Sequence, residues 1–155
     1  MVGQLSAVVN FVPELVTTAT LVVETKGKGF SNISEEVGRF VEESRAGDGV
    51  LFAFLRHTSA SLVIQENADP DVQTDLATAL EKMAPEKGPW VHKVEGPDDM
   101  PAHIKAMVTG VSLQIPVNYG KLWLGTWQGI YLIEHRTQPH KREVILQFVG
   151  SRVGA

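Results

Sequence analysis

The chain has 155 residues, with 14 Lys and Arg against 18 Asp and Glu, a formal net charge of -4 and no cysteine. This length suits one domain with its own hydrophobic core, so we expect residues 1–155 to form a single domain. The lack of cysteine excludes thiol nucleophiles, Cys-ligated zinc and disulfides. The net negative charge disfavours nucleic-acid binding, which needs a basic face to neutralise phosphates.

Targeting and membrane signals are also lacking in the sequence. No stretch approaches the ~18 consecutive apolar residues of a membrane span, and the first residues do not form a basic region followed by an apolar core. We therefore expect a cytoplasmic protein without a membrane partner.

Strands and a first helix are predicted in the N-terminal half. Apolar and β-branched residues at 8–11 and 15–25, split by Pro13, predict two strands in a hairpin-like arrangement. Ser34 as an N-cap, acidic residues in the next turn and apolar residues at helical spacing predict a helix that ends near Arg45. After the turn Gly47-Asp48-Gly49, the apolar run 50–55 predicts a buried strand, and 60–65 its partner.

The C-terminal half alternates helices, loops and strands. Asp69-Pro70 is typical of a helix start, and Pro85 ends that helix. Residues 84–101 hold four prolines and two glycines without periodicity, and a loop this long in a domain is usually functional or disordered. A short helix is predicted from about 102 to 108, and strands at 112–117, 129–136 and 142–149, with another possible at 121–124. These elements predict an α+β fold with largely antiparallel sheets and two or three helices.

His57 follows the buried strand 50–55. Strand ends can present side chains to a pocket, so His57 is a candidate ligand or catalytic group. The alternative is an imidazole bonded to neighbouring backbone. The hydroxyls of Thr58, Ser59 and Ser61 can bind a phosphate or carboxylate, or simply form a turn.

A second polar group surrounds the predicted helix start near residue 100. One of Asp98 and Asp99 is expected to cap this helix, and the other could orient an imidazole. His103 lies four residues after Asp99. Together, His57, His92 and His103 can form a three-nitrogen site with an open position, as in catalytic zinc centres.

Other polar and aromatic residues have ordinary interpretations as well. Glu134 and Arg136 share one face of a strand, which favours an exposed ion pair of under ~1 kcal/mol. Glu66 at a strand end is expected to be mostly solvated. Trp127 lies between Gly125 and Gly129, which suggests unusual backbone angles or close approach. Asn67 and Gln128 can bind a polar ligand or satisfy loop backbone.

Several blocks of the chain together resemble one known family. They are His57-Thr58-Ser59-Ala60-Ser61, Glu66-Asn67-Ala68-Asp69-Pro70, the run from Gly96 to Lys105, and Ser112 through Pro116 to Gly125-Thr126-Trp127-Gln128. In this order they are similar to the YjbQ family, whose members are often labelled secondary thiamine-phosphate synthase. The resemblance extends from about Val8 to Gly150.

The resemblance implies a compact α+β homotrimer with its site in clefts near subunit contacts. It also implies a weak activity that joins a hydroxymethylpyrimidine pyrophosphate to a thiazole phosphate. The expected catalytic residues are Glu66, His57 and Asp99, and the expected metal ligands His57, His92 and His103. The expected substrate-binding residues are Thr58, Ser59, Ser61, Asn67, Lys105, Thr126, Trp127 and Gln128.

The cofactor predicted for this site is a divalent metal, zinc or magnesium. An all-histidine site suits zinc better than the magnesium that a pyrophosphate usually recruits. Two other functions therefore stay open. One is a metal-dependent hydrolase of a small phosphorylated or acyl compound, with Glu66 or Asp99 as the base. The other is a non-catalytic trimeric metabolite-binding protein.

Overall fold

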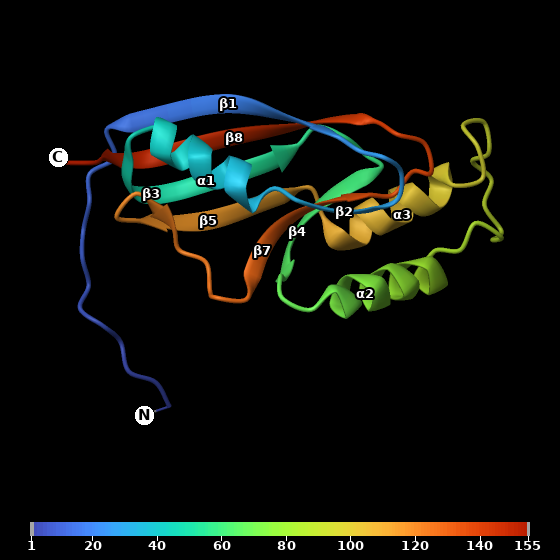
Figure 1. The fold of residues 1–155 in the computed structure, drawn as a ribbon, viewed down its shortest axis with the longest axis horizontal. Coiled ribbons are helices and arrows are strands. Elements are labelled where there is room, and N and C mark those ends of the chain that lie inside the picture. The colour runs from blue at the N-terminus through green and yellow to red at the C-terminus, as the bar shows by residue number, and fades with distance from the viewer. Residues whose placement is uncertain (1, 155) are drawn as a thin grey trace.

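Two antiparallel sheets and three helices make up the computed structural model, which describes residues 2–154 (Figure 1). The five-stranded sheet has the order β1 (Leu15–Glu24), β8 (Lys141–Arg152), β3 (Ala46–Leu55), β5 (Ser112–Asn118) and β6 (Lys121–Leu122). The three-stranded sheet has the order β2 (Gly29–Asn32), β7 (Gln128–Glu134) and β4 (Ala60–Glu66). The helices are α1 (Ser34–Glu43), α2 (Pro70–Met83) and α3 (Asp99–Thr109). This confirms the predicted α+β class.

The hydrophobic core lies between the two sheets and α1. Alternate residues of the central strands β3 and β8 point into it, for example Leu51 and Phe148, and Leu132 enters from β7. The other face of the five-stranded sheet carries exposed apolar side chains, among them Phe52 and Phe54.

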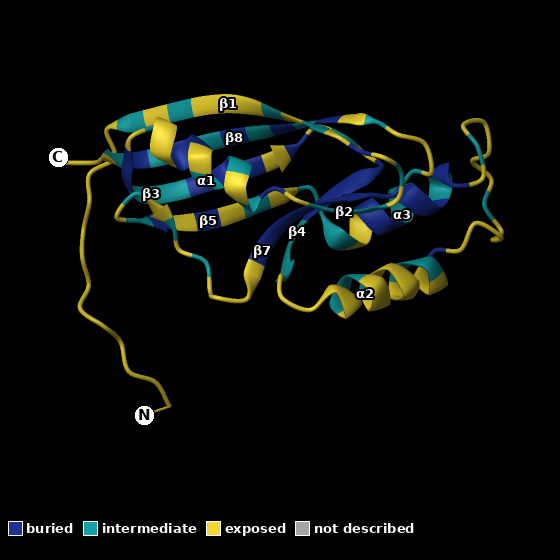
Figure 2. Ribbon diagram, in the orientation of Figure 1, coloured by how far each residue is buried: buried dark blue, intermediate teal, exposed yellow. Residues whose placement is uncertain are grey.

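Only α2 begins as its sequence predicts. Ser34, predicted as the N-cap of α1, is the first residue of that helix, and its hydroxyl accepts a hydrogen bond from the Ile130 N–H instead. Asp69 caps α2, because its side chain accepts a hydrogen bond from the Asp71 N–H, and Pro70 occupies the first turn. All residues of α2 are at least partly accessible to solvent, so this helix lies on the surface of the fold (Figure 2). The predicted helix near 102 begins three residues earlier, at Asp99.

Two strand predictions were wrong. Residues 8–11 lie in an exposed extended segment outside any sheet, because β-branched composition without a hydrogen-bonding partner does not make a strand (Figure 1). The expected turn at 47–49 is instead part of β3, which is irregular between Ala46 and Gly49. A Cβ at Gly49 would lie 2.2 Å from the Val149 carbonyl oxygen, so glycine permits this close pairing with β8.

The β4–β7 pair has two ends that matter for the site. Ala60 pairs with Glu134 at one end, and Glu66 pairs with Gln128 at the other. We call these the α3 end and the loop end. They are six residues apart along β4, which at ~3.3 Å per residue is roughly 20 Å.

Among residues 2–154, no helix is long and apolar enough to cross a membrane.

Candidate metal centre

His92, Asp99 and His103 converge at the α3 end of the fold. The Asp99 Oδ2 atom lies 2.7 Å from His92 Nε2 and 3.0 Å from His103 Nε2. Asp99 and His103 are one turn apart on α3 and so share a face, while His92 comes from the loop before it. The three ligand atoms lie within 4.8 Å of one another. The arrangement offers two imidazole nitrogens and one carboxylate oxygen to a common point.

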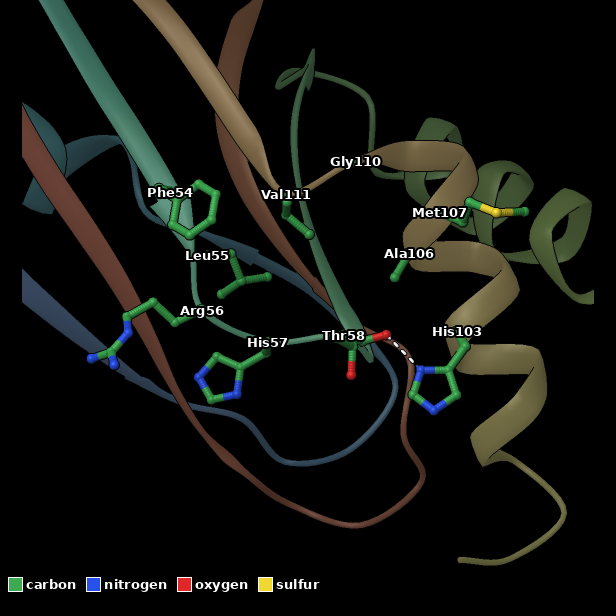
Figure 3. Close-up of a pocket in the computed structure, with 10 residues that line it drawn as sticks. All are labelled: Phe54, Leu55, Arg56, His57, Thr58, His103, Ala106, Met107, Gly110 and Val111. Atoms are coloured by element: carbon green, nitrogen blue, oxygen red, sulfur yellow. Dashed lines mark hydrogen bonds between the residues drawn. The ribbon is translucent and has the colours of Figure 1, made fainter. Parts of the chain in front are cut away.

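The two ring nitrogens of His103 have different partners, and Nε2 is the one that faces the Asp99 carboxylate. His103 Nδ1 lies 2.8 Å from the Thr58 carbonyl oxygen, which can only accept, so Nδ1 carries a proton (Figure 3). In neutral His103, Nε2 therefore holds a lone pair and faces the Asp99 carboxylate. Two acceptors at 3.0 Å need a proton or a metal ion between them.

Arg136 holds the Asp99 carboxylate in place. Its NH1 donates to Asp99 Oδ1 over 2.7 Å, and its Nε donates to Asp98 Oδ2 over 3.0 Å. Burial alone would raise the pKa of Asp99, but the hydrogen bond from His92 and the charges of His103 and Arg136 hold this pKa below its usual value. Asp99 is therefore ionised and presents Oδ2 to both imidazoles.

His57 lies outside this cluster. Its Nε2 accepts a hydrogen bond from the Glu143 N–H over 2.8 Å, and its Nδ1 faces Arg142 NH1 at 3.4 Å. Burial and the positive charge of Arg142 lower the pKa of His57, which favours the neutral ring. Asp99, and not His57, therefore lies with the other two histidines, and a backbone donor already occupies the Nε2 lone pair of His57.

His57 and His103 nevertheless face one groove. This groove has a volume of about 660 Å³ and lies between the end of β3 and the C-terminal half of α3 (Figure 3). Its walls are largely apolar, and include Phe54, Met107 and Val111. A ligand in the groove would contact apolar side chains on both sides and imidazoles along one rim.

Four of the eight predicted substrate-binding residues gather at the loop end. Asn67 Nδ2 donates to the Gln128 carbonyl oxygen, and the Asn67 N–H donates to the Trp127 carbonyl oxygen. Glu66 Oε2 accepts from the N–H groups of Ala68 and Asp69, so this carboxylate satisfies local backbone. Thr126 belongs to the same loop. The predicted site residues therefore fall into two groups at opposite ends of the β4–β7 pair.

Three further residues that were predicted to bind substrate, Ser59, Ser61 and Lys105, have buried side chains. The Ser59 hydroxyl accepts from Arg142 NH2, and the Ser61 hydroxyl lies 2.7 Å from His135 Nε2. Lys105 donates to Glu81 Oε1 over 2.5 Å and so ties α3 to α2. Thr58 lines the groove and contributes its carbonyl oxygen to His103.

The predicted exposed pair of Glu134 and Arg136 was wrong. Glu134 is buried and accepts from Arg142 Nε over 2.7 Å, while Arg136 binds Asp98 and Asp99. The alternating strand pattern places Glu134 and Arg136 on one face but carries no information on partners from other elements. The sequence analysis did not predict the ion pairs of Arg136 and Arg142. Their carboxylate partners, Asp98, Asp99 and Glu134, are not neighbours in the sequence, so no local pattern indicates these pairs.

Comparisons with known proteins identify the family and the fold. The fold and its histidine-carboxylate cluster define a small α+β protein with a candidate metal centre. A family model for UPF0047, YjbQ-like proteins matches residues 19–151. The chain belongs to this YjbQ/UPF0047 family, as recognised from the sequence.

Individual relatives cover most of the chain. A UPF0047 protein of Synechocystis sp. is 50% identical over 84% of this chain and 89% of its own length, and YjbQ of Escherichia coli O157:H7 is 40% identical over 84% and 96%. A crystal structure of an uncharacterized yjbq/upf0047 protein from Clostridium acetobutylicum has a TM-score of 0.78 at 41% identity, covering 84% of this chain and 98% of that one. A hypothetical protein of Aeropyrum pernix has a TM-score of 0.81 at 27% identity, over 87% and 99%.

Proposed function

We propose that this chain is a metal-dependent hydrolase of a small phosphorylated or acyl compound, with His92, Asp99 and His103 as metal ligands. The observation that carries the proposal is the His103 ring, whose Nδ1 bonds to the Thr58 carbonyl and whose Nε2 faces Asp99 Oδ2 at 3.0 Å. Metal-ligating histidines commonly donate their other N–H to a carbonyl or carboxylate, which fixes the ring and its tautomer.

The donor set also favours particular metals. Two imidazoles and a carboxylate suit zinc or iron(II) better than magnesium, which prefers oxygen ligands. Ligand atoms around a tetrahedral ion with bonds of 2.0–2.2 Å lie ~3.3 Å apart, so Asp99 Oδ2 needs to move only slightly away from each imidazole. Three protein ligands leave a position for water or substrate.

The chain's own residues would then prepare the site for hydrolysis. Such a metal supplies Lewis acidity and lowers the pKa of a coordinated water to about 7. Arg136 keeps Asp99 ionised and oriented, and the Thr58 carbonyl fixes the His103 ring so that Nε2 faces Asp99 Oδ2. The groove beside His103 offers a binding surface for the apolar part of a substrate.

The thiamine-phosphate synthase activity implied by the family resemblance is the second candidate. The exposed indole of Trp127 favours it, since an indole can stack on a pyrimidine or a developing cation. The cations at the α3 end count against it, because Arg136, Arg142 and Lys105 already pair with carboxylates. Expected partners are a small-molecule substrate and further copies in a homotrimer, and the expected location is the cytoplasm.

Metal binding by untagged protein tests the proposal. We expect about one zinc or iron(II) per chain by mass spectrometry and titration calorimetry, lost in His103→Ala and Asp99→Asn. His57→Ala is the matched control, since it removes an imidazole from the same groove but outside the cluster, and it should keep the metal. Equal loss in His57→Ala, or no binding by the wild type, would overturn the ligand assignment.

Turnover then separates the functions. Hydrolysis of small phosphate esters or acyl compounds that stops with a chelator and in Asp99→Asn would support the hydrolase. Formation of thiamine phosphate from the pyrimidine pyrophosphate and thiazole phosphate would support the synthase instead. Tight metabolite binding without product would favour a binding protein.

A further inference from the structure

The groove beside His103 has apolar side chains on both of its walls. Phe54 comes from the end of β3 and Met107 from α3, and Val111 lies between them in the view of Figure 3. Phe54 is 50% exposed and Met107 is 79% exposed, and neither belongs to the hydrophobic core. The fold therefore does not need an apolar side chain at either position, whereas an apolar group bound in the groove would remove both from water.

The groove adjoins the His92–Asp99–His103 cluster. His103 belongs to both, since it lines the groove and its Nε2 faces Asp99 Oδ2. Asp99, His103 and Met107 follow one another at intervals of four residues on α3, so they lie along one face of the helix. A compound that reacts at the cluster can therefore extend along this face into the groove. The groove volume of about 660 Å³ has room for a substituent of several carbon atoms.

Among the described residues that line the groove, no cation points towards His103. Arg56 is the one arginine or lysine in this lining, and Figure 3 shows its guanidinium turned away from His103. Its NH1 lies 3.2 Å from Glu143 Oε2. His57 favours the neutral ring, because burial and the charge of Arg142 lower its pKa. A phosphate monoester carries a charge of roughly −1.5 to −2 near pH 7, and the groove gives it no positive partner.

Negative charge predominates at the cluster as well. The guanidinium of Arg136 lies 3.0 Å from Asp98 Oδ2 and 2.7 Å from Asp99 Oδ1, and Glu95 Oε2 lies 3.9 Å from it. Three carboxylates thus share one cation. Their charges disfavour a phosphate dianion, whereas an uncharged acyl group meets no such repulsion.

We propose that the substrates of this site are uncharged carboxylic esters or amides, and that their apolar acyl group lies in the groove between Phe54, Met107 and Val111. The proposal rests on the proposed hydrolase function and selects the acyl class over the phosphorylated one. In the reaction, water adds to the acyl carbon, and the bond from that carbon to the ester oxygen or amide nitrogen breaks. The leaving group takes up a proton, so the products are a carboxylic acid and an alcohol or amine.

Hydrolysis of p-nitrophenyl esters by zinc-loaded protein tests the substrate class. We expect kcat/KM to rise by about fourfold for each methylene group from the acetate through the butanoate to the hexanoate, the factor expected for burial of one CH₂ group. p-Nitrophenyl phosphate should react more slowly than the hexanoate. Equal kcat/KM for the three esters, or faster hydrolysis of the phosphate, would overturn the proposal, while the hydrolase function itself would stand.

Two exposed side chains of the groove can be replaced without disturbing the core. The double variant Phe54→Ser, Met107→Ser should lower the preference for hexanoate over acetate by roughly tenfold and keep the metal. Phe52→Ser, Val108→Ser is the matched control, because Phe52 lies on the same face of β3 and Val108 on the same helix, both exposed and outside the groove. The control should keep the wild-type preference. An equal loss of preference in the two double variants would overturn the assignment of the groove.

Binding of the carboxylate products needs no turnover and separates this proposal from the hydrolase function. In titration calorimetry with zinc-loaded protein, hexanoate should bind more tightly than acetate by the same factor per methylene group, and the Phe54→Ser, Met107→Ser variant should lose this increase. An affinity that does not depend on chain length would contradict an apolar binding groove. If no ester were turned over, the hydrolase function would fail, but binding that strengthens with chain length would still support an apolar ligand in the groove.

Discussion

Acidification to pH 5 should destabilise the protein through His135. This imidazole is 2% exposed, and burial lowers its pKa from 6.5 to about 4, with a further contribution from the charge of Lys105. Between these two pKa values the unfolded chain binds a proton that the folded protein does not bind. Stability is therefore fully present above pH 6.5 and decreases as the pH falls towards 4.

The size of the effect follows from the width of this interval. At pH 5, about 1.5 pH units below the unfolded pKa, the loss is about 2 kcal/mol at 1.36 kcal/mol per unit. Below pH 4 it reaches about 3 kcal/mol and stops growing, because the folded protein then binds the proton as well.

Urea unfolding at pH 8 and pH 5 measures this loss, with EDTA present and at one fixed protein concentration. His135→Gln does not titrate and keeps an amide that can bond to the Ser61 hydroxyl, so it serves as the control. His57, whose pKa is also lowered, is present in both proteins and cancels in the difference. We expect wild type to lose about 2 kcal/mol more than His135→Gln. A difference below ~0.5 kcal/mol would refute the reasoning, since it would mean that the buried ring binds a proton as readily as the unfolded chain.

Two further predictions concern fold stability and are also measured by urea unfolding. Arg142→Met leaves Glu134 buried without its partner and should cost about 3–5 kcal/mol, while the double variant Glu134→Leu, Arg142→Met should recover most of this loss. A double variant as unstable as the single one would show that packing, and not the unpaired charge, dominates. Asp69→Ala removes the cap of α2 and should cost about 1 kcal/mol, whereas the exposed neighbour Asp75→Ala should have little effect.

Elements with strong local signals were predictable from the sequence. Asp69-Pro70 specifies the start of α2 through a side-chain cap and a fixed φ angle, and both depend only on neighbouring residues. The buried strand β3 was visible as an apolar run. Residues 8–11 have an equally good strand composition, yet they form none, because strand formation needs a partner that no local pattern supplies.

In the candidate site, too, the local contacts were predictable from the sequence and the contacts between distant segments were not. Asp99 and His103 are four residues apart on a helix, so their contact follows from helical geometry alone. The contribution of His92 depends on the path of the loop 84–98, and that of Arg136 on the position of β7 relative to α3. These are tertiary relations between segments that are distant in sequence.

His57 and His103 show most clearly what the sequence leaves undecided. Both histidines line the same groove, and both follow from the same family motifs. The Thr58 carbonyl accepts a hydrogen bond from His103 Nδ1, so that His103 Nε2 faces the Asp99 carboxylate, whereas the Glu143 N–H donates to Nε2 of His57. The backbone group opposite each ring therefore decides which histidine can bind a metal. That group is fixed by the pairing of β8 and by the packing of α3 against β4, and only the folded structure shows it.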